Sequence, residues 1–177
     1  MRGLYRVRQF LRHTLARGAS VDLGPAEGVL SGEALALFRR MSPGDQRHGL
    51  DVLARLRAQG AVADDLAVAA LLHDAGKALA GRAPLWRAVV VLLGRRGRGA
   101  LRRLASARPA SWRYPLYVSL HHAALGADLC RQAGCSPAVV RLVRLHDAEP
   151  GVPIDGIPAE PEFGRHLAAL RAADDAS

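Results

Sequence analysis

Apolar residues recur at three- and four-residue steps along most of this 177-residue chain, and proline or glycine interrupts the pattern at several points. Such spacing places the apolar side chains along one side of an α-helix. Alanine, leucine and valine supply most of the apolar half of the sequence, whereas aromatic residues make up only 5%. That mixture suits closely packed helices rather than a β-sandwich. We therefore predict an all-α fold.

The pattern also predicts where the helices lie. Glycine- and proline-rich stretches indicate loops over Ser20–Gly28 and Glu149–Pro161 and a basic turn over Gly94–Gly99, and Gly76 is expected to interrupt the helix before it. Val89–Val91 is equally compatible with a strand. The expected helices are Leu4–Leu15, Ser31–Met41, Pro43 to a stop at Gly60 with Ser42 as its cap, Asp64 through Leu72, Pro84–Leu93, Pro115 to Gly134, Pro137 through His146, and a last helix after Pro161.

Chain length and charge limit the number of domains and the kinds of ligand to be expected. We expect one compact helical domain over residues 31–177, preceded by an N-terminal basic amphipathic helix and loop over residues 1–30. The formal charge of +9 favours anionic ligands, although the use of arginine almost everywhere in place of lysine indicates a coding bias that spreads charge over many solvated faces. No apolar run is long enough to span a bilayer and no signal-peptide core is present, so we expect a cytoplasmic protein.

Lys77 is the only lysine beside 24 arginines, and it stands in the segment His73-Asp74-Ala75-Gly76-Lys77. A compact ammonium can reach a phosphoryl oxygen or an activated water where a broad guanidinium does not fit. His73 and Asp74 form a pair of potential metal ligands, and the three- and four-residue spacing places Lys77 over them on a helix. The alternative is that the one remaining lysine lies beside this pair by chance.

The other histidines favour a metal site. Imidazole and carboxylate donors without thiolate suit iron, manganese, zinc, cobalt or nickel in an open, catalytic site. Cys130 and Cys135 match no zinc spacing and are expected to be reduced thiols. Unpartnered imidazoles on such apolar helices would be costly to bury. The donors that could share one pocket are His48, His73, His121, His122, His146, Asp74 and Asp174.

Three segments resemble the HD-domain superfamily of metal-dependent phosphohydrolases, whose pattern is a histidine, an adjacent His-Asp pair and a distal aspartate on helices. Arg47-His48, the stretch from Ala69 to Lys77, and Ala172-Ala173-Asp174 occur in that order and span about residues 31 to 177. The His-Asp-x-Gly-Lys segment after an apolar helix is the most specific of them. The resemblance implies an all-α fold of the HD-domain type.

A further likeness concerns a second metal. The segment from His122 to Ala127 looks like the His-x-x-Leu-Gly-Ala segment of the subset that includes the cyclic-dinucleotide phosphodiesterases, and His146 looks like the first residue of that subset's following histidine pair. Asp147 stands where the second histidine of the pair is expected, and the glycine-tyrosine-proline signature is absent from Ala148 to Pro158. The departure argues against cyclic-di-GMP as the substrate.

The resemblance implies one or two divalent transition-metal ions. His48, His73, Asp74 and Asp174 would hold one ion, and Asp74 would bridge to a second held by His122 and His146. Whether Asp147, Asp175 or His121 contributes is left open. Asp74 and Lys77 would be the catalytic residues, Lys77 also binding substrate.

The expected activity is hydrolysis of a phosphate ester in a small phosphorylated molecule, a nucleotide or a cyclic nucleotide. One alternative is a non-catalytic HD module that binds a metal, a nucleotide or a partner protein and serves as a sensor or interaction module. The other is a di-iron oxygenase. Nucleic acid is not expected as a partner, and for the first helix, packing against its own domain is preferred to a membrane surface. The oligomeric state is left open.

Overall fold

The computed structural model describes residues 21–81, 98–148 and 161–177, and within them the chain is helical with no strand. The all-α prediction is confirmed. The helices are α2 (Gly24–Glu27), α3 (Gly32–Arg40), α4 (Pro43–Ala58), α5 (Asp64–Leu72), the 3₁₀ helix η1 (Ala75–Ala80), α7 (Arg98–Leu104), α8 (Tyr114–Gln132), α9 (Pro137–Leu145) and α10 (Pro161–Asp175). The expected helices Leu4–Leu15 and Pro84–Leu93 lie outside the described residues, as does nearly all of Glu149–Pro161.

Two helices begin with the same local device. Ser42 accepts a hydrogen bond from the Asp45 amide at 3.2 Å and is followed by Pro43, as predicted. Ser136 accepts a bond from the Val139 amide, also at 3.2 Å, and a proline follows. The serine oxygen satisfies one of the unpaired amides of the first turn, and proline costs nothing there because its missing amide would have no partner. These caps fix where α4 and α9 start.

Three local expectations were wrong. Ser20–Gly28 contains the short helix α2, whose Ala26 is fully buried in the core; four residues are too few to show a helical period. The α-helix does end before Gly76, at Leu72, but Gly76 is not the residue that interrupts it, since it lies inside the 3₁₀ helix η1. Arg98 and Gly99 belong to α7 rather than to a turn. Tertiary packing decides all three, because none of these segments is long enough to be specified by its own sequence.

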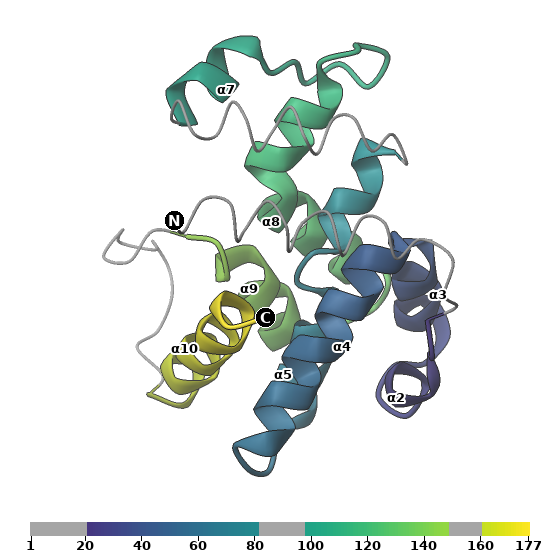
Figure 1. The fold of residues 1–177 in the computed structure, drawn as a ribbon, viewed down its shortest axis with the longest axis vertical. Helices are drawn as coiled ribbons and strands as arrows, with labels where there is room; N and C mark the ends of the chain where they lie inside the picture. Colours follow the sequence, from purple (N-terminus) through teal and green to yellow (C-terminus); the bar gives the residue numbers. More distant parts are fainter. Residues whose placement is uncertain (1–20, 82–97, 149–160) are drawn as a thin grey trace, which may run out of the picture.

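Helix α5 occupies the centre of the molecule, in contact with α3, α4, α9 and α10 (Figure 1). Residues 69–72 have no exposed surface. A helix that is apolar all round has to be covered on every side. Its last turn therefore delivers the next residues, His73 and Asp74, into the interior rather than to the surface.

Helix α8 crosses η1 at very close range. A Cβ atom on Gly76 would lie 2.1 Å from the carbonyl oxygen of His122 and 2.7 Å from the amide nitrogen of Gly126. Only a residue without a side chain permits this backbone approach. The contact sets His122 beside the segment that carries Asp74.

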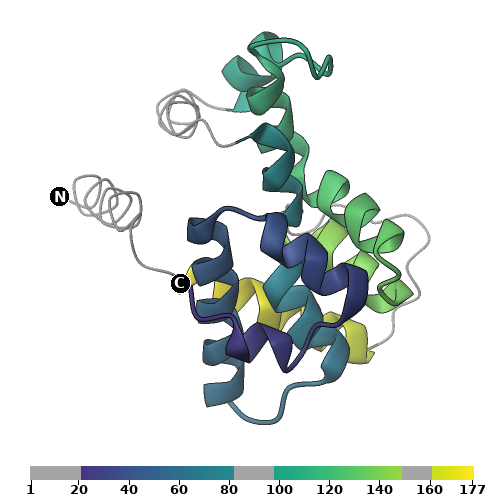
Figure 2. The same ribbon diagram turned by 90° about the vertical axis from the view of Figure 1, so that its right-hand side faces the viewer.

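One part of the chain projects beyond the bundle of α4, α5, α9 and α10. It consists of α7, the connection 105–113 and the N-terminal part of α8, and we call residues 98–117 the arm (Figure 1 and Figure 2). Since α8 continues from the arm into the bundle, it joins the projecting surface to the interior. Among the described helices, none combines the length and apolar character needed to cross a membrane.

Candidate metal centre

The structure brings together the six side chains expected to bind metal, although they are spread over 126 residues of sequence. His73 and Asp74 follow the last turn of α5 and are only 1% and 2% exposed, and His122 and His146 are also buried. His48 and Asp174 are half-buried and border the others. The elements that supply these groups are α4, the α5–η1 junction, α8, the end of α9, and α10.

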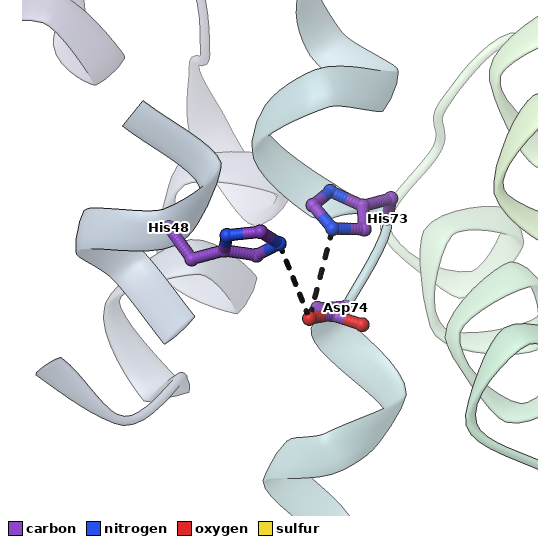
Figure 3. A group of neighbouring side chains, drawn as sticks. All are labelled: His48, His73 and Asp74. Carbon is purple, nitrogen blue, oxygen red and sulfur yellow. Dashed lines mark ion pairs between the residues drawn. The ribbon is translucent and has the colours of Figure 1, made fainter. Parts of the chain in front are cut away.

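Asp74 lies between two sets of histidines, one facing each carboxylate oxygen. Its Oδ2 is 3.6 Å from Nε2 of His73 and 4.0 Å from Nε2 of His48 (Figure 3). Its Oδ1 is 3.5 Å from Nε2 of His122 and 3.9 Å from Nε2 of His146. One carboxylate thus presents an oxygen to each pair of imidazoles.

Three of the histidines are oriented by the same backbone contact. In each, Nδ1 lies against the carbonyl oxygen three residues earlier: His73 on Ala70 at 2.9 Å, His122 on Ser119 at 3.0 Å, and His146 on Val143 at 2.7 Å. A carbonyl only accepts, so Nδ1 carries the proton and the neutral ring presents the lone pair of Nε2. Fixing the tautomer through the outer nitrogen is how protein sites prepare imidazole for a metal.

The surroundings of the His73 Nε2 atom indicate whether a metal would fit. It is fully buried, and no hydrogen-bond partner for it exists among the described residues. A buried polar atom without a partner is costly, and a cation bound to the lone pair would remove that cost. In the described part of the chain, three groups could each hold a metal ion, with donor atoms within 4.8 Å of one another: His48, His73 and Asp74; His73, His146 and Asp174; and Asp74, His122 and His146. The donor chemistry and geometry fit a divalent ion.

Charges in the centre favour the forms that bind cations. Burial raises the pKa of Asp74, but Lys77, His73 and His122 outweigh it and hold that pKa well below its usual value. Burial lowers the pKa of His122, and lowers the pKa of His146 to about 4. At neutral pH, Asp74 is a carboxylate and both buried imidazoles are neutral, which is the protonation state that metal ligands require.

His48 and Asp174 form an ion pair at the rim, with 2.8 Å between Nε2 and Oδ1. This hydrogen bond raises the pKa of His48, and it lowers the pKa of Asp174 against the effect of burial. The last turn of α10 is held in place as well, because Ser177 donates its hydroxyl to the Ala173 carbonyl at 2.7 Å and accepts a bond from Arg55 at 3.1 Å. Asp174 therefore has a defined position near the end of α10.

Lys77 lies three residues after Asp74 and pairs with its Oδ2 at 2.5 Å. The expected proximity is present, although its cause is the 3₁₀ geometry of η1, in which residues three apart lie above one another. The lysine side chain is more than one-third exposed while Asp74 is buried. Its ammonium thus connects the buried carboxylate with the surface.

Three other donors considered from the sequence lie outside this cluster of six, although the charge of Asp147 is close enough to raise the pKa of His122 against the lowering by burial. His121 is exposed and its ring contacts that of Tyr117 at a tilt of 37°, and Asp147 and Asp175 are also exposed. None of the three belongs to a metal-capable group formed by the described residues. Cys130 and Cys135 are free thiols, as expected.

Sequence reasoning missed Arg171 on α10. Its guanidinium donates to the carbonyl oxygens of Leu145 at 2.7 Å, Ala148 at 2.8 Å and His146 at 3.1 Å. These carbonyls lie at and just after the end of α9, where the helix itself leaves carbonyls unpaired, and the Leu145 carbonyl also accepts from the Ala148 amide at 3.1 Å. One arginine among 24 gives no sequence signal for such a contact, yet it holds the backbone of a candidate ligand.

The chain matches no protein-family model, no curated protein and no solved structure.

Proposed function

We propose that this protein is a metal-dependent phosphohydrolase that cleaves a phosphate ester in a small phosphorylated molecule or nucleotide. The observation that carries the proposal is the position of Asp74, whose two carboxylate oxygens face two separate pairs of histidines. A carboxylate shared between two imidazole sets is suited to a pair of cations, and two-cation sites are widely used for phosphoryl transfer. The likeness of the same residues to the HD-domain superfamily agrees with this function.

His48, His73, Asp74 and Asp174 would hold one ion, and Asp74, His122 and His146 a second. Iron, manganese, nickel, cobalt or zinc suit this donor set. When bound, such ions lower the pKa of a coordinated water and offset negative charge on a phosphoryl group.

The protein's own groups prepare the site for an anionic substrate. The carbonyls of Ala70, Ser119 and Val143 hold the proton of three imidazoles on Nδ1, with Nε2 directed inward. Lys77, which pairs with Asp74 and has a partly exposed side chain, would bind a phosphate oxygen of the substrate. A compact ammonium can turn from the carboxylate to the substrate at little cost, since both partners are hydrogen-bond acceptors.

The test combines metal content and hydrolysis in the same samples. Purified wild type reconstituted with each of the five metals should retain one to two ions per chain by elemental analysis and hydrolyse p-nitrophenyl phosphate or bis(p-nitrophenyl) phosphate. His73→Ala should lose both properties. Lys77→Ala should retain the metal and lose at least about tenfold in kcat/KM, as expected when one charge-assisted hydrogen bond to the substrate is removed.

His166→Ala is the matched control, because His166 lies on α10 outside the cluster. It should equal wild type in metal content and rate. Metal binding without hydrolysis of either ester would contradict the proposed enzymatic activity and would favour a non-catalytic sensor module. Equal metal content in wild type and His73→Ala would contradict the proposal that the cluster around His73 binds the metal.

A further inference from the structure

The positive charge of this chain is concentrated in two segments: residues 1–20, with five basic and no acidic residues, and residues 75–127. Residues 75–127 contain ten of the 25 basic residues and none of the 16 acidic ones. Residues 21–74 and 128–177 together contain another ten basic residues and all 16 acidic ones, which gives them a net charge of −6. A coding bias alone would raise arginine everywhere without clearing acids from two segments. The arm, which lies within residues 75–127, is therefore a cationic projection on an acidic body.

The arm presents guanidinium groups together with exposed apolar side chains. Arg102, Arg103 and Arg108 are exposed, Trp112 is 70% exposed and Leu104 is 40% exposed. The connection between α7 and α8 also forms an open cavity of about 380 Å³ at the surface. It is lined by Ser106, Arg108, Ala110, Ser111 and Arg113. The side chains of arginine and serine donate hydrogen bonds, so the cavity suits a phosphate.

A row of rings leads along α8 from this cavity. Tyr114 and Tyr117 stack with centroids 6.1 Å apart and planes inclined by 20°, and Tyr117 contacts His121 at 4.4 Å. His121 immediately precedes His122 of the metal centre. All three rings are at least partly exposed. The row thus offers flat apolar faces between the basic cavity and the metal centre.

A small ligand cannot span this path. Arg113, in the wall of the cavity, and His122 are nine residues apart, which is about 14 Å along an α-helix. A ligand that touches both ends has to be extended and anionic at each end, with flat groups between. A lipid surface would use the charge and Trp112 but would leave the row of rings without a role.

We infer that the arm and the ring row of α8 bind single-stranded nucleic acid, with one phosphate in the Arg108–Arg113 cavity and bases on Tyr114, Tyr117 and His121. The inference rests on the proposed phosphohydrolase function, for which it names an oligonucleotide as the substrate class. It revises the expectation that nucleic acid is not a partner. Stacked bases and a basic track are the two means by which proteins bind single strands without reading their sequence.

The test measures binding without catalysis. Fluorescence anisotropy of a fluorescein-labelled oligouridylate and an oligothymidylate of 12 nucleotides is recorded in EDTA over a salt series. Arg108→Ala and Arg113→Ala should each weaken binding about tenfold and reduce the slope of log K against log salt by about 0.7 for each phosphate that the variant no longer neutralises. Tyr117→Ala should also weaken binding about tenfold but leave the slope unchanged, since the tyrosine ring neutralises no phosphate.

Arg57→Ala provides the control, because Arg57 is an exposed arginine on α4 in the acidic body. It should bind as wild type does. Equal losses in Arg57→Ala and the arm variants would overturn the inference. So would binding to phosphatidylglycerol vesicles with none to the oligonucleotides. Circular dichroism shows whether each variant is folded.

Hydrolysis of bis(p-nitrophenyl) phosphate by the same reconstituted protein separates this inference from the proposed function. Hydrolysis without oligonucleotide binding overturns the inference alone. Oligonucleotide binding without hydrolysis of p-nitrophenyl phosphate or bis(p-nitrophenyl) phosphate overturns the proposed function. The inference that the arm binds nucleic acid would then still stand.

Discussion

At the scale of single residues, adjacent side chains take opposite roles according to where a helix points them. His121 and His122 are neighbours, but His122 is buried against Asp74 and His121 lies exposed on Tyr117. Helical periodicity alone leaves the choice between them open. The likeness to a known motif favoured His122, and the structure supplies the physical reason in the close crossing of η1 and α8.

Protonation of His146 should make the metal-free protein less stable in acid. Its pKa is lowered to about 4 in the folded protein, against 6.5 unfolded, because burial disfavours the charged ring. Below pH 6.5 the unfolded chain therefore binds the proton first, and stability is lost as pH falls toward 4. The loss from this group at pH 5 is about 2 kcal/mol.

Urea unfolding in EDTA at pH 7 and pH 5 measures this loss. His48 acts in the opposite direction, because its raised pKa adds stability in acid, so the comparison is made against His146→Gln. Between pH 7 and pH 5, the free energy of unfolding of this variant should fall by about 2 kcal/mol less than that of wild type. The same pH dependence in wild type and variant would contradict the argument.

At the scale of elements, backbone contacts between helices position the centre. Replacing Gly76 by alanine should cost more than about 2 kcal/mol, because its Cβ would meet backbone atoms of α8 that cannot move independently. Gly164→Ala is the control, since it lies in α10 with nothing within 4 Å of the added atom, and it should be stabilising by up to about 1 kcal/mol. Chemical unfolding measures the free energy of unfolding of both variants. Equal changes would show that the crossing of η1 and α8 has room for a side chain at position 76.

Arg171→Lys should disturb the end of α9 while keeping the charge. A lysine cannot reproduce the planar fork that holds three carbonyls, so we expect a loss of about 1 to 3 kcal/mol together with weaker metal affinity. Thermal unfolding and metal titration of the same variant measure the two effects. Arg165→Lys, an exposed position on the same helix, should change neither. Normal affinity in Arg171→Lys would show that His146 is positioned without it.

At the scale of the whole molecule, metal should hold five segments together. The candidate ligands come from α4, the α5–η1 junction, α8, the end of α9 and α10, and the unfolded chain does not preserve their geometry. At a free metal concentration of 100 Kd, binding adds about 2.7 kcal/mol. That corresponds to a rise in Tm of roughly 5 to 10 °C for a domain of this size.

Differential scanning fluorimetry with and without metal tests this coupling. Asp74→Asn should show no rise in Tm, because it removes the carboxylate shared by both histidine sets. His166→Gln should rise as wild type does. A similar rise in both variants would place the stabilising ion elsewhere on the molecule.

The sequence by itself determined the helical class and the positions of most described helices, because apolar spacing, Ser-Pro caps and glycine stops are local properties. It also singled out the six donors that meet in the structure. Local pattern could not determine that Gly76 lies inside a 3₁₀ helix or that Arg171 holds the end of α9. Nor could it show that the aromatic row of α8 lies between a basic cavity and the centre. Those features depend on contacts between residues far apart in the chain, and only the tertiary structure brings them together.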